Sequence, residues 1–181
     1  MKASTGRAGF SLVEMIISLA ITSILVGTLV QGSRATQKLS STSLTLGRLE
    51  EAASQAALQV AVDIRWAQPD TMLITTENGS DRVDLMIAEG YDGAETTWST
   101  PVIFRYEPVA VDVNENGAAD EGELVRIQDG SRRVICRNVE LGSFSVVRDG
   151  GRVQIQLTVT GLSSNDELLE RDVQLSTTLI N

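Results

Sequence analysis

The sequence predicts an α+β fold in which one long N-terminal helix packs on an antiparallel β-sheet. Two changes of pattern along the 181 residues indicate this fold. Residues 10–67 have a helical pattern that is first apolar on all sides and then amphipathic. After Pro69 the pattern changes to alternating or β-branched runs separated by glycine and polar turns. Because no second helical run interrupts these strands, parallel crossovers are not expected.

The first half of the predicted helix is long enough to cross a membrane. No charged residue occurs from Met15 to Ser33, and about 19 helical residues nearly span a hydrocarbon core of ~30 Å. Lys2 and Arg7 precede this stretch, so the positive-inside rule places the N-terminus in the cytoplasm. The apolar stretch is too long for an ordinary secretory signal peptide. We therefore expect a single-pass membrane anchor.

The second half of the helix carries one apolar face. Its apolar residues recur at spacings of three and four, which places them on one side of a helix; they are Leu46, Leu49, Ala53, Ala56, Val60 and Ile64. Pro69 is expected to end the helix, since the residue before a proline disfavours helical geometry. The predicted division is a leader at 1–9, a membrane half at 10–33, an amphipathic half at 34–68 and a β-rich domain at 69–181.

Turn residues separate the predicted strands. The pairs Asn78-Gly79 and Asp129-Gly130 and the run from Asp149 to Gly151 each lie between runs that alternate or are β-branched. Such pairs favour tight hairpins, because asparagine, aspartate and glycine tolerate positive φ. One face of the resulting sheet can pack on the amphipathic half of the helix.

Composition argues against two classes of function. The chain has 24 acidic and 15 basic residues, so it is not expected to bind nucleic acid through charge. It has no histidine, which removes the commonest general base and a common metal ligand. The single cysteine, Cys136, cannot form an intramolecular disulfide and is expected to be a buried core thiol. No catalytic constellation is found, and we do not expect an enzyme.

The start of the apolar segment carries a specific motif. A short basic leader ends at Gly9 and is followed by Phe10, Ser11, Leu12 and, after Val13, the lone charge Glu14. A carboxylate in an apolar span is costly unless it is paired or lies near enough to the interface to stay hydrated. The segment resembles the processing signal of the type IV pilin superfamily, which includes major pilins, minor pilins and type II secretion pseudopilins.

The resemblance implies a maturation route and a set of partners. Prepilin peptidase would cut between Gly9 and Phe10, and the new amine of Phe10 would be N-methylated. Glu14 would pair with an N-terminal amine, usually that of a neighbouring subunit. Other pilin or pseudopilin subunits and an inner-membrane assembly platform would be partners. The protein would lie in the inner membrane before assembly, and afterwards in a periplasmic pseudopilus or an extracellular pilus.

The β-rich domain carries a looser resemblance. It lacks a disulfide pair, and residues 172–181 are similar to the ends of W-type minor pilins and J-type pseudopilins. This similarity implies a minor structural subunit of a pilus or related pseudopilus. A type II secretion pseudopilin, a tip-located binding module and an exported enzyme with an uncleaved anchor are the alternatives.

Residues 112–123 form a candidate calcium loop. Oxygen ligands at positions 1, 3, 5, 7, 9 and 12 suit Ca²⁺, and these positions are Asp112, Asn114, Asn116, the Ala118 carbonyl, Asp120 and Glu123. The loop resembles an EF-hand loop, with Gly117 at the sharp turn, but it departs from one at Ala119. Its flanking runs are strand-like, so we expect it to join two strands. A plain turn rich in glycine and asparagine is the alternative.

The chain has two tryptophans, Trp66 and Trp98. We expect Trp66, near the end of the helix, to pack in the core or at an interface. Trp98 is expected in a loop, where packing is favoured over a contact role.

Overall fold

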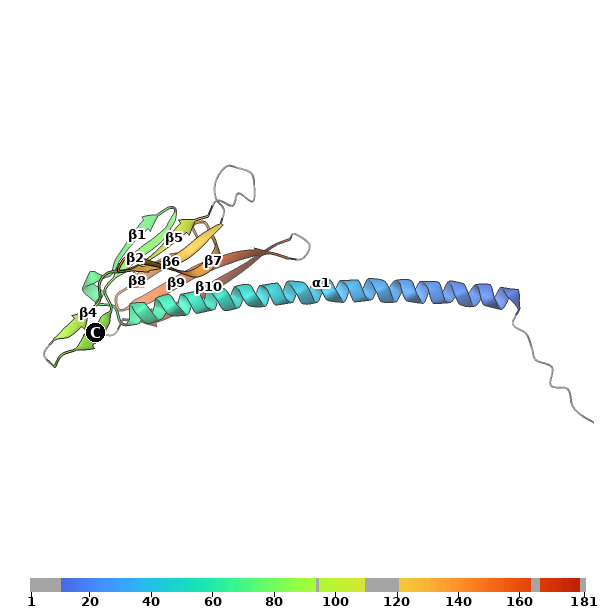
Figure 1. Ribbon diagram of the computed structural model, residues 1–181, viewed down its shortest axis with the longest axis horizontal. Coiled ribbons are helices and arrows are strands. Elements are labelled where there is room, and N and C mark those ends of the chain that lie inside the picture. The colour runs from blue at the N-terminus through green and yellow to red at the C-terminus, as the bar shows by residue number, and fades with distance from the viewer. Residues whose placement is uncertain (1–10, 94, 110–120, 164–166, 180–181) are drawn as a thin grey trace, which may run out of the picture. The chain divides into compact units, whose positions relative to one another are not determined.

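A computed structural model describes residues 11–93, 95–109, 121–163 and 167–179 and confirms a long helix followed by an antiparallel sheet (Figure 1). The chain divides into two compact units, residues 1–41 and 42–181. Helix α1 runs from Leu12 to Arg65 and contributes to both units. The described residues of the first unit are almost all helical, whereas the second unit contains the rest of α1 and all the strands.

Within the second unit, α1 packs on the sheet through small and β-branched side chains. The buried residues of the helix are Ala53, Ala56, Ala57, Val60, Ala61 and Ile64. This confirms the predicted apolar face, and the alanines allow helix and sheet to approach closely. An ion pair of 2.7 Å between Asp63 Oδ2 and Arg126 Nε supports the same contact, with both side chains mostly buried.

The main sheet has eight antiparallel strands in the order β1-β2-β5-β6-β7-β9-β10, and β8 also pairs with β9. A separate two-stranded sheet contains β3 and β4. The bounds are β1 Leu73–Glu77, β2 Ser80–Leu85, β3 Ala88–Tyr91, β4 Thr96–Trp98, β5 Val102–Pro108, β6 Glu121–Gln128, β7 Ser131–Glu140, β8 Ser145–Asp149, β9 Arg152–Leu162 and β10 Leu168–Thr178. A short 3₁₀ turn, Pro69–Thr71, follows α1.

The predicted tight turns are present. Asn78 and Gly79 join β1 to β2 with φ of 52° and 76°, and Asp129 and Gly130 join β6 to β7 with φ of 52° and 72°. Positive φ at both central residues is typical of a type I′ turn, whose twist matches that of the paired strands. These turns fix the register of two hairpins.

Asp81 links two strands that are distant in the sheet order. Its backbone N–H donates to the Phe144 carbonyl (2.9 Å), and its Oδ2 accepts from the backbone N–H of Val146 (2.7 Å). Asp81 lies in β2, whereas Val146 lies in β8, which pairs with β9. The sheet therefore curves around the core, whose largest buried side chains include Tyr106 and Phe104.

The tryptophans differ from expectation. Trp66 is 53% exposed, so of its two predicted positions the core is wrong, and packing at an interface stays a prediction. Trp98 is 36% exposed and ends β4 rather than lying in a loop. The reason is the hairpin of β3 and β4. It forms its own small sheet next to the end of α1, to which it is joined by a hydrogen bond from Ala88 N to Trp66 O.

The position of Cys136 leads to a labelling prediction. The residue is 4% exposed, and burial raises the pKa of its thiol to about 11. Because thiolate is the reactive form, we expect a disulfide reagent at neutral pH to label the native chain at least ~100-fold more slowly than the urea-unfolded chain. Because Cys136 is the single cysteine of the chain, the absorbance change of the labelling reaction reports on this residue alone. Equal rates in both states would contradict the buried position.

Candidate functional site

A reciprocal pair of hydrogen bonds holds the start of α1. The backbone N–H of Ser11 donates to Glu14 Oε2 (2.9 Å), and the backbone N–H of Glu14 donates to Ser11 Oγ (3.2 Å). This Ser-x-x-Glu arrangement is a capping box, which satisfies backbone donors that a helix start otherwise leaves unpaired. Glu14 therefore lies in the first turn of α1 with its carboxylate directed back toward the N-terminus.

This geometry leaves part of the Glu14 carboxylate available. Oε2 accepts the capping bond, whereas Oε1 makes no hydrogen bond to any residue that the structure describes. The cleavage and methylation positions, Gly9 and Phe10, lie outside the described residues. An ammonium group brought to this end of the helix would find a carboxylate oxygen that can accept from it while the cap is retained.

The segment that follows Glu14 is apolar and exposed. Leu12, Leu19 and Leu29 are each more than 70% exposed, and other large apolar side chains up to Val30 are also exposed. A contiguous apolar surface of this kind is typical of contact with a membrane or with other helices. By length and composition, α1 is the one candidate membrane span in the part of the chain that the structure describes.

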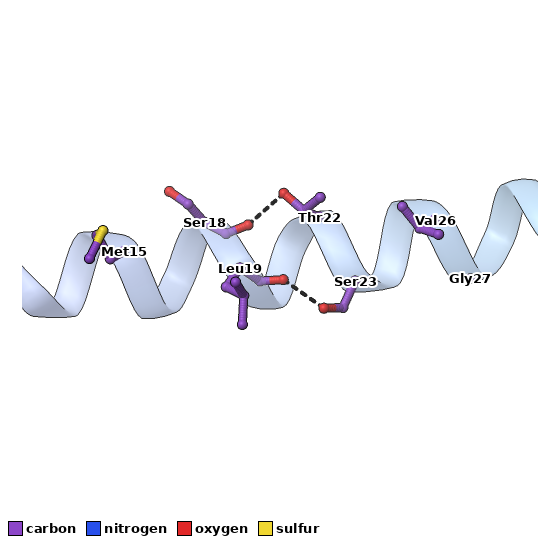
Figure 2. Close-up of a pocket in the computed structure, with 7 residues that line it drawn as sticks. All are labelled: Met15, Ser18, Leu19, Thr22, Ser23, Val26 and Gly27. Carbon is purple, nitrogen blue, oxygen red and sulfur yellow. Dashed lines mark hydrogen bonds between the residues drawn. The ribbon is translucent and has the colours of Figure 1, made fainter.

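Figure 2 shows one face of this segment, where a shallow groove is lined by Met15, Ser18, Leu19, Thr22, Ser23, Val26 and Gly27. The Thr22 hydroxyl donates to the Ser18 carbonyl and the Ser23 hydroxyl donates to the Leu19 carbonyl, each at 2.7 Å. Hydroxyls bonded within the helix in this way do not need water. These polar residues are therefore compatible with a hydrocarbon environment.

The candidate calcium loop can be followed only in part. Asp112, Asn114, Asn116, Ala118 and Asp120 lie outside the described residues. The flanking strands β5 and β6 pair antiparallel, so the predicted strand-like flanks are confirmed. The last three residues of the predicted loop, 121–123, belong to β6 itself. Within the described residues no group of three or more acidic, cysteine or histidine side chains is arranged to hold a metal ion.

Glu123, the last predicted ligand, lies in a network of charges. It is the cross-strand partner of Glu107, and Arg132 bridges the two through Nε to Glu107 (2.7 Å) and Nη2 to Glu123 (2.8 Å). Arg137 lies 3.3 Å from the other oxygen of Glu123. Burial alone raises the pKa of Glu107, but hydrogen bonds from Arg105 and Arg132 lower it below the ordinary value. A cation in the loop would have to share Glu123 with two guanidinium groups.

Comparison with protein families gave one match. Residues 4–30 match the model of the prokaryotic N-terminal methylation motif, and the match includes Gly9, Phe10 and Glu14. Curated proteins and solved structures gave no match. The matched motif points to a structural protein rather than an enzyme. The chain carries the N-terminal methylation motif of a type IV pilin-like prepilin-peptidase substrate, joined to a helix that suits membrane anchoring.

Proposed function

We propose that the chain is a minor structural subunit of a type IV pilus or a related pseudopilus. One observation carries the proposal. The methylation motif at residues 4–30 coincides with an exposed apolar helix whose first turn presents Glu14. A cleavable leader, an apolar helix and a single carboxylate at its start are the parts needed to pass from a membrane into a helical filament core.

Maturation would begin with hydrolysis of the peptide bond between Gly9 and Phe10. Water would add across this bond, leaving a carboxylate on Gly9 and an amine on Phe10, which is then methylated. The methylated amine keeps its positive charge, so it can still form an ion pair. In the filament it would pair with Glu14 of a neighbouring subunit, where the apolar surroundings make an unpaired carboxylate costly.

The mature N-terminus tests this proposal. Mass spectrometry of the chain purified from its native membrane is expected to find N-methylphenylalanine at Phe10. A matched variant, Gly9→Leu, is expected to retain the leader, because the side chain would obstruct the cleavage position. An intact Met1 in the native protein, or a terminus beyond the apolar segment, would refute the assignment.

The alternative within the same class is a type II secretion pseudopilin. The same cleavage and the same helix serve both, and the two differ in their neighbouring subunits. Cross-linking in the native membrane, followed by identification of the linked subunits, is expected to distinguish a pilus from a periplasmic pseudopilus.

We also propose that residues 112–123 bind Ca²⁺, with Asp112, Asn114, Asn116, Ala118, Asp120 and Glu123 as ligands. The spacing of oxygen ligands supports this, and Glu123 lies near the start of β6, where the loop would rejoin the sheet. Millimolar Ca²⁺ is expected to raise the melting temperature of the full chain, and Asp112→Asn is expected to remove the effect.

Glu123 needs a matched control because it also pairs with arginines. Glu107→Gln removes a carboxylate from the same Arg132 bridge but is not one of the predicted ligands. Glu123→Gln should therefore abolish the calcium-dependent shift, whereas Glu107→Gln should keep it. If the calcium-dependent rise in melting temperature were unchanged in both Glu123→Gln and Asp112→Asn, a plain turn would be favoured over a calcium site at residues 112–123.

A further inference from the structure

Both tryptophans of the chain line one cleft in the second unit. The cleft has a volume of about 480 Å³, and Trp66 and Trp98 contribute to its wall from positions 32 residues apart in the sequence. The two residues are 53% and 36% exposed. Large indole surfaces exposed together are unusual on a solvated surface, since exposed aromatic area is costly unless something covers it.

Backbone contacts hold the two tryptophans in place. Trp66 follows the last residue of α1, and Trp98 is the last residue of β4. Ala88 lies between them, because its N–H donates to the Trp66 carbonyl (3.0 Å) and it is the cross-strand partner of Trp98. Ala88 also lines the cleft, and its small side chain leaves the space open. The cleft is therefore built into the fold.

The polar side chains of the cleft are free to bind a ligand. Arg65, Gln68, Asp70 and Thr96 all line it, and none makes a side-chain hydrogen bond or ion pair with the described part of the chain. By contrast, Arg105 and Arg132 in the network of charges around Glu107 are paired with carboxylates. With one cation and one anion in its wall, the cleft suits an uncharged ligand that both donates and accepts hydrogen bonds.

We propose that this cleft binds a saccharide, with the C–H face of a pyranose ring against the tryptophans. A pyranose has an apolar face and hydroxyl groups that donate and accept, and this combination matches two indoles surrounded by Arg65, Gln68, Asp70 and Thr96. The volume lies in the range of small-ligand sites. Nucleic acid is disfavoured, because Arg65 is offset by Asp70 and the chain has a net charge of −9.

The test uses the full chain in phospholipid nanodiscs, because many mild detergents carry sugar headgroups. The probes are cellohexaose, chitohexaose and maltohexaose. Since both tryptophans line the cleft, all tryptophan emission reports on it. At least one probe is expected to give a saturable change in emission. The measurement needs neither leader cleavage nor filament assembly, so its outcome is independent of the function proposed above.

Three variants locate the binding. Trp98→Ala is expected to weaken binding by roughly tenfold or more, as truncation of a central tryptophan does at many binding sites. Ala88→Leu keeps both indoles but fills the cleft, and it should cause a similar loss. Tyr91→Ala is the matched control, because Tyr91 is a 71% exposed aromatic of the same hairpin that does not line the cleft. It should bind as the native chain does.

Two outcomes would overturn the proposal. One is the absence of any emission change with all three probes. The other is binding that Trp98→Ala and Ala88→Leu both leave unaltered. Loss of iodide quenching of the tryptophans in assembled filaments, together with the first outcome, would assign the cleft to a neighbouring protein subunit instead.

Discussion

Replacing Glu14 with alanine is expected to leave removal of the leader intact but to reduce recovery of the chain in filaments by roughly tenfold or more. A charge-assisted hydrogen bond in apolar surroundings contributes about 1.5–3 kcal/mol, and loss of ~1.4 kcal/mol lowers an equilibrium constant tenfold. The measurement is the ratio of assembled to membrane-bound subunit by quantitative immunoblotting. The position of the cut is checked by mass spectrometry of the same samples.

The capping box makes it possible to separate two roles of Glu14. Its Oε2 accepts from Ser11 within the chain, whereas Oε1 remains available to an amine. Glu14→Gln keeps an oxygen that can cap the helix but removes the charge, so it should impair assembly as Glu14→Ala does. Ser11→Ala removes only the hydroxyl cap and should assemble normally. If Glu14→Gln were recovered at native stoichiometry, an ion pair to Glu14 would not be needed for assembly.

Local patterns were sufficient to predict the helix and most of the strands. Apolar spacing placed Ala53, Ala56 and Val60 on the buried face of α1, and asparagine-glycine and aspartate-glycine pairs marked turns that have positive φ. Both signals depend only on neighbouring residues, because periodicity and turn chemistry are properties of a short segment. The methylation motif is local in the same way, and the family comparison agrees with it.

Contacts between distant residues could not be predicted in this manner. The bonds of Asp81 to β8 and the ion pair of Asp63 with Arg126 each join residues more than 60 positions apart. The tryptophan cleft depends on β3 and β4, whose short and polar runs gave little strand signal. Composition suggested packing for Trp66, and only the arrangement of the hairpin beside the end of α1 shows that its indole is exposed.

Gly122→Ala is expected to destabilise the β-rich unit by about 3 kcal/mol, the upper part of the usual range for overpacking a core. A Cβ at this position would lie 2.5 Å from Cε2 and 2.6 Å from Cζ of Tyr106, and it would also overlap the carbonyl oxygen of Glu107. Tyr106 is fully buried. Neither the ring nor the paired backbone of β5 can move aside cheaply, because interiors are close-packed.

Thermal unfolding of the full chain, followed by near-ultraviolet circular dichroism, measures this effect, and a fall of roughly 10 °C in melting temperature is expected.

Gly151→Ala is the matched control, since a Cβ there would have no atom within 4 Å. Gly122 lies in β6 and Gly151 in the turn between β8 and β9. Both variants replace glycine with alanine, so a difference between them reports on space in the folded chain rather than on backbone freedom in the unfolded chain. Equal melting temperatures for the two variants would mean that the contact of Gly122 with the Tyr106 ring does not constrain the junction of β5 and β6. A large loss confined to Gly122→Ala would instead show that the pairing of β5 with the start of β6 is fixed by close packing, which holds Glu123 opposite Glu107 at the point where the proposed calcium loop ends.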